Sequence, residues 1–206
     1  MLSWVRLTLL MVLICLCRLD IAWSACPVEG DNPSPRLQRL DRLKNRVAVP
    51  ATLLPVPLAQ FLAPGDDRTR WSEDQAVTVT GFVAAVKAGG LETVNCHAKE
   101  LENRDTHLVL VLRQGDAPKT GMVMEVTPIW REKMAVQGID WSTATLKKTL
   151  LGQCVEVSGW VFFDLEHANA STNTAPHGKA NWRQTMTELH PVTALTVVAP
   201  SACVGL

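Results

Sequence analysis

Histidines and carboxylates are the residues of this chain that are best suited to chemistry. The sequence holds only five histidines. Four of them lie beside acids or other polar residues that can bind a metal, in the runs Asn95-Cys96-His97, Asp105-Thr106-His107, Asp164-Leu165-Glu166-His167 and Glu188-Leu189-His190. A carboxylate beside an imidazole can orient the ring, fix its tautomer, or join it in holding a divalent metal.

Strand spacing strengthens two of these runs, because side chains at positions i and i+2 of a strand share a face. Asp105 and His107 therefore share one face, and so do Glu188 and His190. Glu125 lies within an apolar strand, where an acid is costly to bury unless it is paired. If these groups converge at one end of a barrel, they form a site for zinc or a harder divalent metal. The predicted ligands are Asp105, His107, His167, Glu188 and His190.

The alternative is structural: each His–carboxylate pair could cap a strand end or satisfy buried backbone groups. Motifs typical of common catalytic sites are missing. The chain has no His-Glu-x-x-His helix, no Gly-x-Ser-x-Gly elbow and no phosphate-binding Gly-x-x-x-x-Gly-Lys loop.

A second group of candidate ligand-binding residues follows a long polar loop over 164–181. Trp182 could stack on a base or a sugar ring, while Lys179 and Arg183 meet phosphate. The alternative is that Trp182 packs at the rim of a barrel, with its N–H bonded to the backbone.

Three functions remain open. The leading hypothesis is an exported, non-catalytic binding module with an unknown small-molecule or polymer ligand and a possible metal contribution. The alternatives are a metal-dependent hydrolase, acting for example on phosphodiesters, and a single-stranded nucleic-acid binder. Lys+Arg and Asp+Glu each number 20. Nucleic acid is therefore not the favoured partner, because a formally neutral chain has no global attraction for it.

The elements that must position these residues are mostly strands. Alternating or continuous apolar runs predict strands over 77–86, 107–112, 122–127, 154–163 and 184–198, the last broken near Pro191. Residues 139–151 predict one short helix, between the third and fourth strands. This is the element order of the OB-fold, a five-stranded Greek-key barrel.

Two Gly-bearing runs, Val77-Thr-Val-Thr-Gly-Phe and Val155-Glu-Val-Ser-Gly-Trp, look like the two Gly-bearing strands often seen in OB barrels. Together with Asp164-x-Glu166-His167 and Glu188-Leu-His-Pro-Val192, they make residues 71–198 resemble a family of exported bacterial OB-like proteins without an established activity. The resemblance implies a fold rather than a function.

The chain divides into three predicted parts. Residues 1–25 resemble a signal peptide, with one cation, a short apolar run and small residues at the end. Residues 26–70 form a Pro-rich arm with a short basic amphipathic helix over 36–46, and residues 71–206 form the barrel domain. A secreted or periplasmic location follows. A lipid anchor on Cys26 is the minority alternative.

Removal of the signal peptide leaves four cysteines: Cys26, Cys96, Cys154 and Cys203. Four cysteines in an exported chain allow three disulfide pairings, and their spacing does not choose among them. The pairing we consider first joins Cys26 to Cys203, which would tie the two ends of the mature chain together, and Cys96 to Cys154.

Overall fold

The computed structural model describes residues 26–204. The predicted signal peptide, residues 1–25, lies outside the described residues. Within 26–204, no helix is long and apolar enough to cross a membrane.

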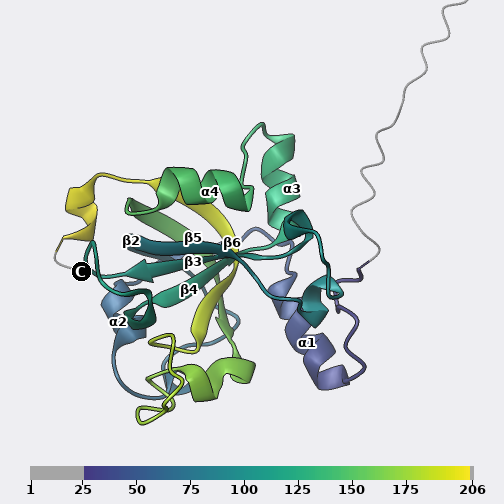
Figure 1. Ribbon diagram of the computed structural model, residues 1–206, viewed down its shortest axis with the longest axis horizontal. Helices are drawn as coiled ribbons and strands as arrows, with labels where there is room; N and C mark the ends of the chain where they lie inside the picture. The colour runs from purple at the N-terminus through teal and green to yellow at the C-terminus, as the bar shows by residue number, and fades with distance from the viewer. Residues whose placement is uncertain (1–25, 205–206) are drawn as a thin grey trace, which may run out of the picture.

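Five strands close into a barrel at the centre of the molecule (Figure 1). They are β2 (Ala76–Ala88), β3 (Thr106–Val111), β4 (Met122–Val126), β5 (Cys154–Phe163) and β6 (Thr187–Val197). β2, β3 and β4 pair antiparallel in sequence order, and β6 pairs parallel with β4 and antiparallel with β5. An antiparallel β2–β5 pairing closes the sheet. The predicted mostly β fold, a five-stranded OB-like barrel, is confirmed.

The barrel interior is apolar because alternate residues of each strand point inward. Leu108 and Leu110 of β3, Met124 of β4 and Leu189 of β6 belong to this core and are fully buried. β6 continues through Pro191, and the register against β5 shifts beside Gly159. Gly159 allows the close approach there, because a β-carbon on it would lie 2.7 Å from the carbonyl oxygen of Pro191.

Two helices connect β4 to β5, where the sequence predicts one. α4 (Thr143–Leu150) falls within the predicted range and begins at Ser142, whose side chain accepts from the Thr145 amide. α3 (Pro128–Val136) precedes it. Thr127 caps α3 in the same way, and proline in the first turn of a helix loses no hydrogen bond.

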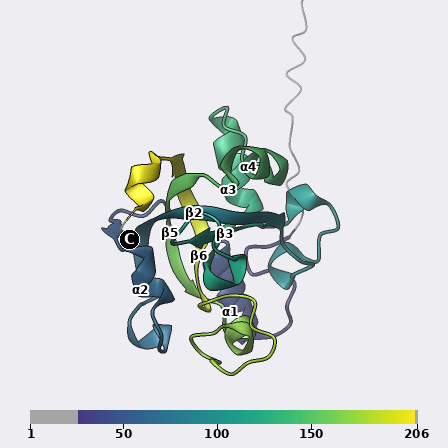
Figure 2. The same ribbon diagram turned by 60° about the vertical axis from the view of Figure 1, so that its left-hand side comes forward.

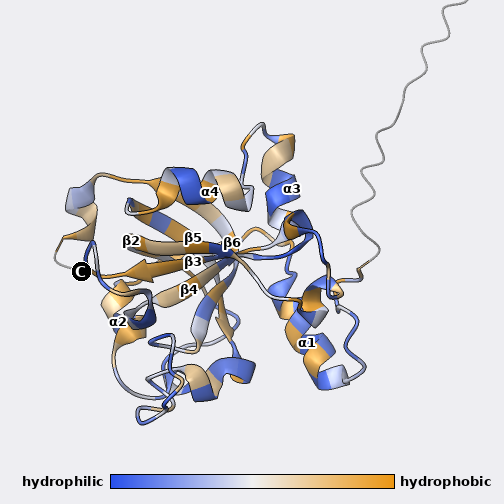
Figure 3. Ribbon diagram, viewed as in Figure 1, coloured by the Kyte–Doolittle hydropathy of each residue, from blue (hydrophilic) through white to orange (hydrophobic). Residues whose placement is uncertain are grey.

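The Pro-rich segment forms α1 (Pro35–Lys44), the two-residue strand β1 (Leu54–Pro55) and α2 (Leu58–Leu62). β1 pairs parallel with β2, and Leu58 and Phe61 of α2 are part of the barrel core. Figure 2 shows α1 and α2 beside the barrel, and Figure 3 shows apolar and polar residues mixed along α1, whereas α2 is mostly apolar. Short 3₁₀ turns lie at Asp67–Thr69, Thr93–Asn95, Leu101–Asn103, Pro118–Thr120, Leu165–Ala170 and Pro200–Cys203.

The disulfide pairing considered first is wrong. The structure joins Cys26 to Cys96 and Cys154 to Cys203. The first bridge fastens the start of the arm to the β2–β3 loop, and the second fastens the C-terminal turn to β5. The two ends of the described segment, residues 26–204, are therefore tied to the barrel separately. Because the Cys26 sulfur is in a disulfide, this structure does not have it free to carry a lipid.

Candidate functional site

Three neighbouring strands carry a polar row on the face opposite the barrel core. His107 of β3 pairs with Glu125 of β4, and Met124 of β4 pairs with Leu189 of β6. Glu125 and His190 are therefore the next positions along two parallel strands. Since Leu108, Met124 and Leu189 point into the core, their neighbours His107, Glu125 and His190 point to the other face.

His190 is the centre of this row and is fully buried. Its Nε2 lies 3.6 Å from Oδ2 of Asp105. Its Nδ1 lies 3.5 Å from Oε2 of Glu125 and 3.4 Å from Oε2 of Glu188. The Phe162 ring of β5 meets the imidazole edge-to-face, with 5.6 Å between ring centroids. Three carboxylates therefore surround one imidazole in a site without access to water.

Several of these buried atoms have no hydrogen-bond partner. They are both carboxylate oxygens of Asp105, Oε2 of Glu125, Nε2 of His190 and both ring nitrogens of His107. Buried polar atoms in native proteins are nearly always paired, so a convergent set of unpaired ones requires an explanation. Asp105, Glu125 and His190 each offer a ligand atom, and these atoms all lie within 4.8 Å of one another.

Two cations hold the acids on either side of this group. Arg183 is 1% exposed. It donates from one guanidinium nitrogen to Asp164, at 2.7 Å, and from another to Glu188. Asp164 also binds Nδ1 of His167, at 2.5 Å. This chain of contacts connects the exposed His167 to the buried Glu188.

The second cation comes from the N-terminal arm. Lys44, the last residue of α1, is buried, and its ammonium lies 3.2 Å from Oε2 of Glu92 in the β2–β3 loop. The same ammonium stands 5.6 Å from the centroid of the Phe162 ring. The arm therefore contributes a charge to the site. We define the polar cluster as Lys44, Glu92, Asp105, His107, Glu125, Asp164, Arg183, Glu188 and His190.

The charges of the polar cluster do not balance. Its five carboxylates face two permanent cations, Lys44 and Arg183. Burial raises the pKa of Asp105 to about 7, and the nearby Glu92 adds to this rise. Burial also raises the pKa of Glu125 well above its usual value, with Glu188 the next cause. The site therefore disfavours full ionisation of its acids unless further positive charge is present.

The bases of the cluster respond to the same surroundings. Burial lowers the pKa of His107 to about 4 and holds the pKa of His190 well below its usual value. Burial alone would lower the pKa of Lys44, but Glu92 and Glu125 raise it above its ordinary value. Both histidines are therefore neutral near pH 7, the state in which an imidazole nitrogen can bind a metal.

A divalent cation fits this donor set. Two carboxylates and a neutral imidazole are ligands for zinc, or for manganese and similar ions that accept oxygen and nitrogen together. An ion among Asp105, Glu125 and His190 would give the unpaired atoms a partner and offset the excess of acid. The buried Asp/Glu/His group can therefore hold a metal ion.

A hollow of about 420 Å³ leads from the surface to the polar cluster. Its lining includes His107 and Glu92 of the cluster, together with Lys87, Glu166, His167 and Trp182. The backbone of Gly89 lies against the His107 ring: a β-carbon on Gly89 would stand 2.9 Å from Nε2. His107 thus lies between the hollow and Glu125, whose Oε1 is 3.2 Å from its Nε2.

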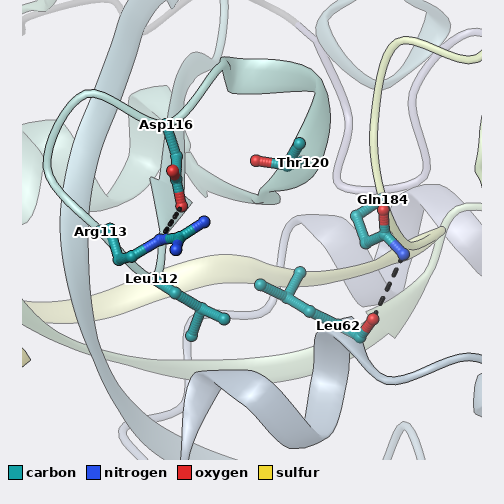
Figure 4. A pocket seen from close by; sticks show the side chains of 6 residues that line it. All are labelled: Leu62, Leu112, Arg113, Asp116, Thr120 and Gln184. Carbon is teal, nitrogen blue, oxygen red and sulfur yellow. Dashed lines mark hydrogen bonds and ion pairs between the residues drawn. The ribbon is translucent and has the colours of Figure 1, made fainter. Parts of the chain in front are cut away.

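A second hollow, of about 260 Å³, lies between α2 and the β3–β4 hairpin. Its polar groups have partners of their own (Figure 4): Arg113 pairs with Asp116 at 3.4 Å, and the Gln184 amide donates to the Leu62 carbonyl at 3.3 Å. It therefore lacks the unpaired buried groups that distinguish the first hollow.

The residues predicted from sequence are distributed unequally around the site. Asp105 and His190 lie in the three-residue metal group, Glu188 adjoins His190, and His107 adjoins Glu125. His167 lies at the mouth of the first hollow, and Trp182 lines it. Lys179 is exposed and is not among the residues that line this hollow. Arg183 is buried against two acids rather than turned toward solvent.

Sequence reasoning missed Lys44 and Glu92, and did not count Glu125 among the ligands. The sequence did indicate that Glu125 has a partner, because a lone acid buried in an apolar strand is costly unless it is paired. The partner of Glu92 comes from α1, 48 residues away. No local pattern signals such a contact.

Comparison with known proteins adds no identification. No protein-family model matches the chain, and no curated protein matches it.

Proposed function

We propose that this protein is an exported OB-fold binding module that holds a divalent metal ion through Asp105, Glu125 and His190. One observation carries the proposal: Asp105, Glu125 and His190 each place a ligand atom within 4.8 Å of the others, and both oxygens of Asp105, Oε2 of Glu125 and Nε2 of His190 have no hydrogen-bond partner. Burying such groups without compensation costs free energy. A bound cation removes that cost.

The position of the cluster in the fold supports a binding role. OB barrels bind ligands on the face of their second and third strands, between the loops that follow strands one and four. Those strands are β3 and β4 here. The loop after β2 carries Glu92, and the loop after β5 carries Asp164 and Arg183.

The disulfides support the exported location, since such bonds form and persist mainly in oxidising compartments. The export route would use the predicted signal peptide, and mass determination of the mature protein from the native cell would locate its first residue.

Metal content and affinity test the proposal. We expect the mature protein, purified without chelator, to carry one divalent ion per chain by elemental analysis. Glu125→Gln and Asp105→Asn should weaken binding of Zn²⁺ or Mn²⁺ in titration calorimetry by at least about tenfold, because each removes a charged ligand. Glu156→Gln is the matched control, since Glu156 is an exposed acid of β5.

Metal should also stabilise the fold. Ion at about 100 times its dissociation constant adds about 2.7 kcal/mol to the free energy of unfolding. For a protein of this size, that raises Tm by roughly 5–10 °C. An unchanged Tm with both ions, together with metal-free protein from gentle purification, would refute the proposal.

A metal-dependent hydrolase is the second candidate, favoured by the hollow that opens onto His107 beside Glu125. A metal ion near this opening could polarise a substrate or activate water. Release of nitrophenol from a chromogenic phosphodiester by the metal-loaded protein, lost in Glu125→Gln, would favour it over a binding module. A single-stranded nucleic-acid binder has less support, because Arg183 is occupied by Asp164 and Glu188.

A further inference from the structure

The hollow above His107 contains an unpaired group that points to a ligand. His107 lines the hollow, is only 9% exposed, and makes no hydrogen bond from either ring nitrogen, although Nε2 lies 3.2 Å from Oε1 of Glu125. A neutral imidazole offers one donor and one acceptor. A molecule in the hollow can therefore gain a hydrogen bond that the protein itself leaves unmade.

Trp182 provides a flat wall beside this group. The Arg183 guanidinium lies 4.5 Å from its ring centroid and the Lys87 ammonium lies 5.2 Å from it. Arg183 is buried and is not among the lining residues, whereas Lys87 is exposed and lines the hollow with Trp182. The His167 ring also packs edge-to-face against Trp182, with 5.4 Å between ring centroids. A planar group would therefore stack where the flexible Lys87 side chain now lies.

The mouth of the hollow carries basic groups that can meet an anion. Lys87 and His167 are the basic groups, and Asp164 raises the pKa of His167. Of the two acids in the lining, Glu92 is bound to Lys44 and Glu166 is exposed. Lys87, His167 and His107 can present three donors, and a phosphate monoester has three terminal oxygens to accept them.

We infer that this hollow binds a phosphate monoester attached to a flat ring system, of which a nucleoside monophosphate is the simplest form. The ring packs on Trp182, and the phosphate meets Lys87, His167 and His107. The inference rests on the proposed function only in that the metal would add positive charge behind His107. The hollow of about 420 Å³ falls within the roughly 300–1,000 Å³ typical of small-molecule sites.

Calorimetric titration of the metal-loaded protein with adenosine 5′-monophosphate, adenosine and inorganic phosphate tests the inference. We expect the monophosphate to bind at least about tenfold more tightly than either part alone, because ring and phosphate are recognised together. Lys87→Ala and Trp182→Ala should each weaken its binding by at least about tenfold. Lys179→Ala is the control: it removes an exposed cation of the 164–181 loop that does not line the hollow, and it should leave the affinity for the monophosphate unchanged.

Two oligothymidylates of six nucleotides, one with a 5′-phosphate and one without, test whether the natural ligand is a free nucleotide or the end of a strand. Tighter binding of the 5′-phosphorylated strand than of the monophosphate would identify a strand end as the source, and weaker binding would identify the free nucleotide. Both outcomes keep the phosphate-and-ring chemistry. Equal affinity for adenosine and its monophosphate, or full affinity in both Lys87→Ala and Trp182→Ala, would overturn the inference.

The same titration in metal-free protein separates this inference from the metal proposal. If the monophosphate binds and Lys87→Ala weakens that binding, the proposed nucleotide site is supported even if no metal binds. If the wild-type protein does not bind the monophosphate, while Trp182→Ala binds metal with wild-type affinity, the proposed nucleotide site is refuted. The metal proposal is then unaffected.

Discussion

Strands β3 and β4 and the first half of β6 are buried on both faces, yet the two faces are built differently. The inner face carries side chains such as Leu110, Met124 and Leu189, which pack only with other apolar groups of the core. The outer face carries Glu125 and His190, which are also nearly inaccessible to water. The inner face stabilises the barrel by removing apolar area from water. The outer face buries ionisable groups, whose charged forms cost free energy to remove from water.

This difference indicates that the outer face is maintained for a task other than stability. Replacing a buried network of charges with apolar side chains is often neutral or stabilising. Proteins commonly accept such a cost at functional sites, where activity requires groups that the fold would otherwise exclude. The following predictions test whether the two faces differ in this way.

The largest difference should come from one truncation on each face. Leu110→Ala should lower the free energy of unfolding by about 2–5 kcal/mol, because it leaves a cavity in the core. Glu125→Gln should leave metal-free stability unchanged or higher, because burial and the nearby Glu188 disfavour an ionised carboxylate at this position and glutamine carries no charge. Urea denaturation of both variants without metal measures the contrast. A loss of several kcal/mol in Glu125→Gln would show that the outer face is structural.

Loss of either disulfide should lower stability, but only one of the two losses should also weaken metal binding. Removal of either pair by serine substitution should cost about 2–5 kcal/mol of stability. Only loss of Cys26–Cys96 should also weaken metal binding, because that bridge fastens the arm bearing Lys44 to the loop bearing Glu92. Cys154–Cys203 packs in a separate apolar cluster with Phe82 and Val111. Calorimetry with Mn²⁺ checks this, and equal affinities in the two variants would contradict it.

The smallest effect should be a dependence of stability on pH in metal-free protein. Asp105 has a pKa of about 7 when folded and about 3.9 when unfolded. The folded state therefore binds more protons, and this group loses stability as pH rises toward and through 7. The lowered pKa of His107, about 4, acts in the opposite sense, and its contribution levels off only above its unfolded value of about 6.5.

The histidine contribution still changes above pH 6.5, because an unfolded imidazole is half protonated there. Asp105→Asn isolates the carboxyl contribution. We expect the stability difference between the metal-free wild type and Asp105→Asn to fall by roughly 1 kcal/mol between pH 6.5 and 8, measured by chemical denaturation at fixed ionic strength. Saturating metal should remove this change. A difference that stays constant or rises over this interval would show that Asp105 is ionised in the folded protein without a metal.

Local patterns were sufficient for the barrel. Each strand carries an apolar alternation or an apolar run that needs no information from elsewhere in the chain, and the order of elements then restricts the topology. The i, i+2 spacing of Asp105 with His107 and of Glu188 with His190 identified residues of the polar cluster for the same reason: a side chain's face follows from its place on the strand. The second helix, α3, went unpredicted although Thr127-Pro128 is a helix-start signal.

Tertiary structure alone decided what those residues face. The parallel register of β4 and β6 brings Glu125 to His190 across 65 positions of sequence, and the fold pairs Cys26 with Cys96 rather than Cys203. In the sequence, Lys44 is one of several cations of a basic helix, whereas in the folded protein its side chain is buried against Glu92. Spacing along the chain determines the direction of a side chain within its own element, whereas its partner depends on how distant elements pack, which no local pattern encodes.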